Sequence, residues 1–283
     1  MHSYRFESAT AVVTGAASGI GEALAFGLAR RGTSLVLLDR NADGLAAVAD
    51  TLRRRHPQLQ IDTVVADLAD RDAADRVGRQ LASEHPETSL LINNAGVALF
   101  GTFDQVSLED FNWVLDVNLR AVVTLTHHLL PVLRTHPGAH LANVSSVFGL
   151  IAPAGHAAYV ASKFGVRGFT DALRHELAGE LGVTCVHPGG VATQIAANAR
   201  RGSGVTERHD TAGRKAFERL LTIRPEKAAE AILSGIERRR ARVLIGYTAT
   251  LPDLMVRVAP SSYGKVVGVL MNRGRRPAQT SVT

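Results

Sequence analysis

A short apolar run, Ala11-Val12-Val13, leads directly into three closely spaced glycines and a helix-forming stretch. The glycines, Gly15, Gly19 and Gly21, follow the spacing G-x-x-x-G-x-G. Glycine permits the positive φ angles and the close backbone approach that a pyrophosphate group needs. The helix that starts near Ile20 would direct its N-terminal amides and its dipole at such a group. The segment therefore predicts a strand, a tight turn and a helix arranged to hold a dinucleotide.

The alternation of short apolar strands and amphipathic helices continues along the chain. It predicts an α/β fold, a doubly wound parallel sheet of about seven strands with helices on both faces, of the Rossmann type. The expected strands cover residues 11–13, 34–38, 61–65, 90–92, 140–144, 183–186 and 243–245, and the expected helices lie near 20–31, 42–55, 71–83, 108–134, 157–180 and 226–238.

A chain of 283 residues suits one domain of this type, which we expect to span residues 1–250. The long irregular segment at about 190–224 is rich in Gly, Ala, Arg and Thr, and we expect it to be a lid with a short helix at 211–221. Residues 251–283 form a basic C-terminal extension.

The net charge of +6 is unevenly distributed, because the segment from Ile236 onward has nine basic and two acidic residues. No interleaved aromatic platform accompanies these charges, so we expect no nucleic-acid partner. The alternating apolar and basic residues of 254–276 leave two interpretations open. The segment packs over a cleft or a subunit interface, which is favoured, or it touches an anionic membrane surface.

The chain has no apolar run of about 18 residues and no leader-like beginning, so a cytoplasmic location is expected. Its single cysteine, Cys185, is expected to be a buried thiol in a strand. The eleven histidines form no ligand pattern, and we expect no metal. His187, which precedes Pro188, is expected in a loop.

An acidic residue, Asp39, ends the second expected strand, eighteen residues after Gly21. A carboxylate there can accept hydrogen bonds from the hydroxyls of an adenosine ribose, and it would repel a 2′-phosphate. Arg40 follows and could attract that phosphate. The position of Asp39 nevertheless favours NAD over NADP as the cofactor. Asn41 can cap the next helix, so Asp39 is not needed for capping.

Residues 159–163 read Tyr-Val-Ala-Ser-Lys, and Ser146 lies thirteen residues before Tyr159. Lys163 is one helical turn beyond Tyr159 on the same face. Taking hydrogen from an alcohol needs a base for the hydroxyl proton, and a free tyrosine, with a pKa near ~10, is a weak base at neutral pH. We expect the charges of Lys163 and of an oxidised nicotinamide to lower the pKa of Tyr159.

With these motifs the chain resembles the short-chain dehydrogenase/reductase family, in its shorter single-domain branch. The resemblance covers about residues 9–193 and includes Asp67, Asn93-Asn94-Ala95-Gly96, Asn118, Pro188-Gly189 and Thr193. It implies a nicotinamide-dependent oxidoreductase. The implied catalytic residues are Asn118, Ser146, Tyr159 and Lys163, and the implied cofactor-binding residues are Gly15, Ser18, Gly19, Ile20, Gly21, Asp39, Arg40, Asp67, Leu68, Asn94, Ala95, Gly96, Tyr159, Lys163, Pro188, Gly189, Val191 and Thr193.

The resemblance also assigns parts to these residues. Asp67 would contact the adenine, Asn118 would relay protons through water to Lys163, and Thr193 would lie near the nicotinamide. Strand alternation places Ser145 and Ser146 on opposite sides, and the family spacing selects Ser146 as donor to the substrate oxygen. The resemblance further implies a homodimer or homotetramer formed through the helices at 108–134 and 157–180.

Apolar residues follow both candidate motifs, Val97 to Phe100 after the Asn-Ala-Gly segment and Val147 to Ile151 after Ser146. They are either core residues or the border of the pocket, and in the second case they favour a lipophilic secondary alcohol or ketone as the small-molecule substrate. An alternative is a binding protein that senses the nicotinamide cofactor without turnover, although such a sensor would not need all four catalytic residues. A sugar-nucleotide epimerase or dehydratase would usually have a different glycine spacing.

Overall fold

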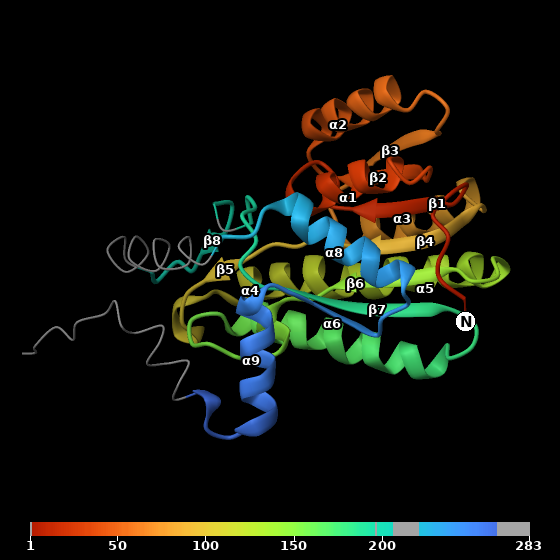
Figure 1. Cartoon of the computed structure of the whole chain (residues 1–283). Helices are drawn as coiled ribbons and strands as arrows, with labels where there is room; N and C mark the ends of the chain where they lie inside the picture. Colours follow the sequence, from red (N-terminus) through yellow and green to blue (C-terminus); the bar gives the residue numbers. More distant parts are fainter. Residues whose placement is uncertain (1, 196, 206–220, 265–283) are drawn as a thin grey trace, which may run out of the picture.

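A seven-stranded parallel sheet with the strand order β3-β2-β1-β4-β6-β7-β9 forms the centre of the computed structural model (Figure 1). The structure describes residues 2–195, 197–205 and 221–264. The strands are β1 (Thr10–Thr14), β2 (Ser34–Asp39), β3 (Ile61–Val65), β4 (Thr88–Asn93), β6 (His140–Val144), β7 (Gly182–Pro188) and β9 (Arg242–Ile245). The predicted doubly wound fold is confirmed.

Helices cover both faces of this sheet (Figure 1). One face carries α1 (Gly19–Ala29), α2 (Ala42–Arg55) and α8 (Pro225–Glu237), and the other carries α3 (Arg71–Glu84), α5 (Ala121–Thr135) and α6 (Ala157–Glu176). Ala11 and Val13 of β1 join the apolar cluster under the first group, whereas Val12 joins the cluster under the second. A strand covered on both faces needs an apolar residue at every position, as in Ala11-Val12-Val13.

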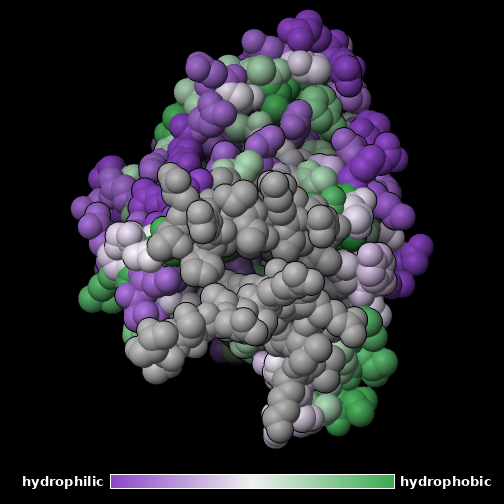
Figure 2. All heavy atoms as spheres, turned by 90° about the vertical axis from the view of Figure 1, so that its left-hand side faces the viewer, coloured by the Kyte–Doolittle hydropathy of each residue, from purple (hydrophilic) through white to green (hydrophobic). Residues whose placement is uncertain are grey.

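The strand order reverses between β1 and β4, because the chain first moves outward to β2 and β3 and then returns to the other side of β1. In sheets of this type, ligands bind outside the carboxyl ends of the strands at such a reversal. Figure 2 looks onto this edge of the sheet. Hydrophilic residues dominate its upper part, and hydrophobic residues emerge at its lower right, at the height of α9 in Figure 1.

The predicted single helix at 108–134 is instead three segments in a row. These are α4 (Leu108–Leu115), the five-residue π-helix η2 (Asp116–Arg120) and α5. A π-helix places one extra residue in a turn and is frequently found at functional sites. Asn118 lies within it, fully buried.

Two short strands were not predicted. β5 (Leu99–Phe100) pairs in parallel with β8 (Arg200–Arg201), which lies in the irregular segment at about 190–224. The two ends of that segment lie together, since the amides of Thr222 and Ile223 both donate to Gly190 O, each over 3.0 Å. The expected helix at 211–221 lies outside the described residues, except for its last position.

Helix α9 (Tyr247–Val258) runs through position 250, where we expected the C-terminal extension to begin. Its inner side joins β9 through an ion pair between Arg242 and Asp253, with Nη2 and Oδ1 2.7 Å apart. Its outer side exposes Tyr247, Leu251, Leu254 and Val258. Across the described residues, no helix is long and apolar enough to cross a membrane.

The short 3-10 helices η1 (Phe103–Gln105) and η3 (Val147–Gly149) complete the fold near the carboxyl edge. Cys185 is fully buried in β7, as predicted.

Candidate active site

The glycine turn after β1 has the geometry that its sequence predicts. Gly15 and Gly19 have φ angles of 68° and 59°, in the left-handed region that favours glycine. A Cβ at Gly21 would lie 1.9 Å from Gly15 O, so only glycine fits there. Ser18 is the N-cap of α1 and is exposed, and its side chain makes no capping hydrogen bond. The turn therefore leaves its first helical amides open at the carboxyl edge.

The segment after β4 packs directly against this turn. Thr14 Oγ1 accepts hydrogen bonds from the amides of Asn94 and Ala95, each over 2.9 Å, and Asn94 Nδ2 donates to Thr14 O over 2.9 Å. A Cβ at Gly19 would lie 3.2 Å from the Thr193 methyl group, so Thr193 borders the turn from the other side. The structure therefore brings these predicted cofactor-binding residues together.

Asp39 is tied to the glycine turn through its carboxylate. Its Oδ2 accepts from Ala17 N over 3.0 Å, and its Oδ1 accepts from Asn41 N over 2.9 Å. Asn41, as expected, caps α2 by accepting from Gly44 N over 3.2 Å. Each carboxylate oxygen has a further lone pair for a ribose hydroxyl. Arg40 is exposed beside it.

The other predicted cofactor-binding residues lie along the same edge. Asp67 follows β3 and accepts from Ala69 N over 2.9 Å, whereas the Leu68 side chain belongs to the core. Gly189 follows β7, and a Cβ there would lie 2.1 Å from Thr248 Oγ1. Pro188 and Val191 are buried, and Ile20 packs against the core. Leu68 and Val191 can therefore face a ligand only through their backbones, whereas the side chain of Ile20 is partly exposed.

The two adjacent serines after β6 have different partners. Ser145 Oγ donates to Lys163 O over 2.8 Å and so fixes α6 to the sheet. Ser146 Oγ accepts from Phe148 N over 3.1 Å and lies close enough to the Tyr159 side chain to lower its pKa. The structure thus gives a physical reason to choose Ser146, where strand alternation alone left both serines open.

Lys163 lies deep beneath Tyr159. Its Nζ is 5.8 Å from the centre of the tyrosine ring and donates to Val144 O over 3.0 Å. Burial lowers the pKa of Lys163 to about 8. Burial raises the pKa of Tyr159, and the nearby Ser146 side chain offsets only part of this rise. The expected lowering of the Tyr159 pKa is therefore absent from the protein alone, because loss of water around the hydroxyl is the larger effect.

Asn118 uses its side chain to hold the segment after β4. Its Oδ1 accepts from Val97 N over 2.8 Å, and its Nδ2 donates to Val97 O over 3.0 Å and to Ser162 Oγ over 3.1 Å. A Cβ at Gly96 would lie 3.3 Å from Asn118 Oδ1 and 3.4 Å from Lys163 Nζ. Asn118 and Lys163 therefore flank the same glycine, but the amide of Asn118 is already engaged.

Apolar and aromatic groups surround Tyr159. Phe148 and Ile151 form a small buried cluster, against which Tyr159 packs together with Met255 and Val256 of α9. The His156 ring lies 5.1 Å from the ring of Phe100 and 5.0 Å from that of Phe148, and burial lowers its pKa to about 4. Sequence reasoning missed His156 and α9, because neither belongs to a motif.

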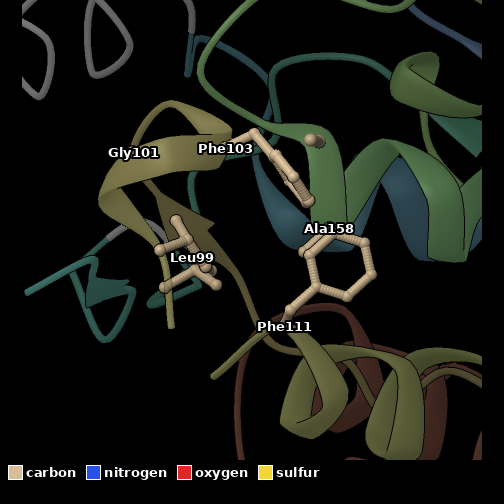
Figure 3. Close-up of a pocket in the computed structure, with 7 residues that line it drawn as sticks. Leu99, Gly101, Phe103, Phe111 and Ala158 are labelled. Atoms are coloured by element: carbon tan, nitrogen blue, oxygen red, sulfur yellow. The ribbon is translucent and has the colours of Figure 1, made fainter. Parts of the chain in front are cut away.

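A second apolar surface lies beside Ala158, the neighbour of Tyr159. Figure 3 shows a small pocket there, with the rings of Phe103 and Phe111 and the side chain of Leu99 at its walls. Its lining is Leu99, Gly101, Phe103, Val106, Phe111, Ala157 and Ala158. Leu99, one of the apolar residues after the Asn-Ala-Gly segment, thus lines an apolar pocket.

Comparison with known proteins identifies the family that has this arrangement. A family model described as short chain dehydrogenase matches residues 9–204. The chain belongs to the short-chain dehydrogenase family. This short-chain dehydrogenase is an oxidoreductase, which is also how its relatives are described.

Two relatives illustrate the range of similarity. The putative oxidoreductase SadH of Mycobacterium tuberculosis is 39% identical over 269 residues, which are 93% of this chain and 95% of that protein. Dehydrogenase/reductase SDR family member 7B of Xenopus tropicalis is 30% identical over 280 residues, which are 95% of this chain and 88% of that protein.

Solved structures show the same fold with either nicotinamide cofactor. A short-chain dehydrogenase from Burkholderia phymatum in complex with NAD has a TM-score of 0.81 and 28% identity, covering 97% of this chain and 99% of that one. One from Sphingobium yanoikuyae in complex with NADPH has a TM-score of 0.73 and 26% identity, covering 97% and 98%. A nicotinamide cofactor also fits the residues of this short-chain dehydrogenase, because the Ser18 side chain leaves the first amides of α1 uncapped at the glycine turn and the Asp39 carboxylate lies at the end of β2.

Proposed function

We propose that this short-chain dehydrogenase interconverts a secondary alcohol and a ketone, with Tyr159 as the acid and base. The observation that carries the proposal is the contact of Tyr159 with two partners. The Ser146 hydroxyl lies near its side chain and lowers its pKa, and Lys163 lies beneath its ring with Nζ 5.8 Å from the ring centre. Both partners favour the ionised phenol, Ser146 through its polar hydroxyl and Lys163 through its charge.

In the direction of oxidation, the substrate hydroxyl would lie between Ser146 Oγ and the Tyr159 hydroxyl. Ser146 Oγ already accepts a hydrogen bond from Phe148 N, so its own proton is free to be donated to the substrate oxygen. Tyr159 takes the hydroxyl proton as the C–O bond becomes a carbonyl. A bound nicotinamide accepts the hydride in this direction and supplies it in the other. In reduction, Tyr159 returns the proton to the carbonyl oxygen.

We propose NAD as the preferred cofactor. Support comes from Asp39, whose carboxylate is held at the end of β2 by the amides of Ala17 and Asn41. A 2′-phosphate in that place would meet a fixed negative charge. Arg40 is the alternative contact, and it would become important if Asp39 were removed.

A lipophilic substrate best fits the surroundings of Tyr159. Phe148, Ile151, Met255 and Val256 offer apolar contact on one side.

Arg200 contacts two residues of α4, with its guanidinium 3.8 Å from the ring centre of Trp113 and Nη1 3.1 Å from Asp110 Oδ1. This anchor, from the segment at about 190–224, supports the proposal that the segment acts as a lid.

The test is an activity screen paired with one substitution. Purified protein is mixed with NAD or NADP and with hydroxy and keto compounds of graded chain length, and nicotinamide absorbance is followed. We expect turnover with lipophilic compounds and a fall of at least about 100-fold for Tyr159→Phe, the usual scale of acid–base catalysis. Binding of NAD to the variant should be unchanged. Near-normal turnover by Tyr159→Phe would rule out the mechanism.

We further propose that the chain pairs through α4, α5 and α6. Val123 of α5 and Phe164 of α6 are exposed, at 38% and 36% of their surface, on helices that also pack inward. Light scattering at micromolar concentration should report a dimer or tetramer, and Phe164→Asp should reduce the assembled mass. A monomeric native protein would contradict this pairing.

A further inference from the structure

His187 is fully buried in β7 and reaches the backbone of Ser146. Its Nδ1 lies 3.0 Å from Ser146 O. The expectation that His187 lies in a loop is wrong, since β7 continues through Pro188 and pairs there with Ile245 of β9. Pairing with β9 continues the strand through His187 to Pro188, beyond the last residue that pairs with β6.

The contact fixes which nitrogen of His187 carries the proton. Ser146 O is a carbonyl and can only accept, so Nδ1 must be the donor. Nε2 is then unprotonated, and it has no hydrogen-bond partner among the described residues. Burial lowers the pKa of His187 to about 4, so the ring is neutral at ordinary pH. Its single N–H group therefore donates to Ser146 O.

Both oxygens of Ser146 are held as the chain leaves β6. Ser146 O accepts from Gly149 N over 3.0 Å as well as from His187. Ser146 Oγ accepts from Phe148 N over 3.1 Å. The bonds from Phe148 and Gly149 belong to the η3 turn itself, whereas the bond from His187 joins this turn to β7, next to the bond from Ser145 N to Val186 O over 2.8 Å.

We propose that His187 is a positioning residue for the reaction, because its Nδ1–H group fixes the Ser146 carbonyl and thereby aims the Ser146 hydroxyl at the substrate oxygen. The proposal rests on the proposed function, in which Ser146 donates to that oxygen. Small errors in placing a donor weaken its bond to the reacting oxygen, so loss of this tie should lower kcat more than it changes substrate or cofactor binding.

Three substitutions separate this role from simple packing. His187→Asn can place an amide N–H near the position of Nδ1, His187→Gln places its amide near Nε2, and His187→Leu has no donor. We expect kcat to fall about tenfold for the glutamine and leucine variants, the scale of one lost hydrogen bond. The asparagine variant should recover most of that loss. KM and the Kd for NAD should change little.

The result that overturns the proposal is equal kcat for the asparagine and glutamine variants, or near-native kcat for the leucine variant. Melting temperatures measured alongside show whether a variant is folded. If the leucine variant fails to fold, the comparison of asparagine with glutamine still decides.

A double substitution distinguishes failure of this inference from failure of the proposed function. If His187 acts through Ser146, adding His187→Leu to Ser146→Ala should cause no further loss of kcat. A full additional tenfold loss would show that His187 acts elsewhere and would overturn the inference alone. If Ser146→Ala itself keeps native kcat, the proposed function fails first.

Discussion

The buried Nζ of Lys163 donates a hydrogen bond to Val144 O, 3.0 Å away, at the last residue of the strand that leads to Ser146. The ammonium group is thereby held under the Tyr159 ring by the sheet rather than by another side chain. Because burial lowers the pKa of Lys163 to about 8, its charge is present below that pH and is lost above it.

Replacing Lys163 by Met should shift the pH profile of alcohol oxidation. The positive charge favours the ionised form of Tyr159, so its removal should raise the apparent pKa of the rising limb and lower kcat at pH 7. Steady-state rates between pH 6 and pH 10 measure this shift. Lys163→Arg, which keeps the charge, should retain a lower apparent pKa than Lys163→Met. Superimposable profiles for native protein and Lys163→Met would contradict the role of Lys163.

Replacing Asp39 by Ala should weaken NAD binding and strengthen NADP binding. The change removes the carboxylate that Ala17 and Asn41 hold at the end of β2, and leaves Arg40 free to meet a 2′-phosphate. Titration of each cofactor by fluorescence gives both dissociation constants. Arg40→Ala is the matched control and should leave NAD binding nearly unchanged. Tighter binding of NADP than of NAD by the native protein would refute the preference.

Two glycine-to-alanine substitutions in helices should have opposite effects. At Gly21 the new Cβ would lie 1.9 Å from Gly15 O, so Gly21→Ala must distort the turn and should abolish measurable cofactor binding. At Gly168, in the middle of α6, nothing lies within 4 Å of the added Cβ. Gly168→Ala should therefore stabilise the protein by about 0.5–1 kcal/mol. Thermal melts and cofactor titrations of both variants check this contrast.

Acid should destabilise the protein through His140. This residue is fully buried, its Nε2 lies 2.8 Å from Thr184 Oγ1, and burial lowers its pKa to about 3 from 6.5. The unfolded chain takes up a proton below about pH 6.5 and the folded chain does not, so stability is complete above that pH and falls as pH drops toward 3. At pH 5 the loss from His140 is about 2 kcal/mol.

His140→Gln keeps a donor near Thr184 but cannot titrate. Its free energy of unfolding, measured by denaturant at pH 7 and pH 5, should therefore fall less than that of the native protein. Substitution of the exposed His175 by Gln serves as the control and should leave the acid sensitivity as it is. Equal acid sensitivity in all three proteins would contradict the assignment.

The regular part of the fold could be predicted because it follows from periodicity. Residues 61–65 and 140–144 were predicted as strands and are strands over the same ranges, because apolar and β-branched residues predominate in both. Residues 42–55 were predicted as a helix and are one, with Asn41 capping it. These features depend on neighbours within a few residues, which the sequence displays directly.

The features that could not be predicted depend on contacts between segments that are distant in the sequence. The π-helix at Asp116–Arg120 surrounds Asn118, whose side chain bonds to Val97, twenty-one residues away. His187 belongs to a strand because it pairs with Leu244 of β9. The packing of α9 against Phe148 joins residues about a hundred positions apart. The local conformational preferences of residues do not reveal contacts between distant segments.

The π-helix also divides one long helix into two parts, α4 and α5, that are rotated about the helix axis relative to each other. In a regular α-helix each residue turns the helix by about 100°, so one extra residue turns everything before it by about that angle relative to everything after it. Val114, before the π-helix, accordingly packs with Leu99 and Ala158, whereas Leu125 and Leu129, after it, pack against the sheet beside α3. A deletion of one residue within 116–120 would restore a regular helix, and would also turn α4 away from the pocket wall that it now forms.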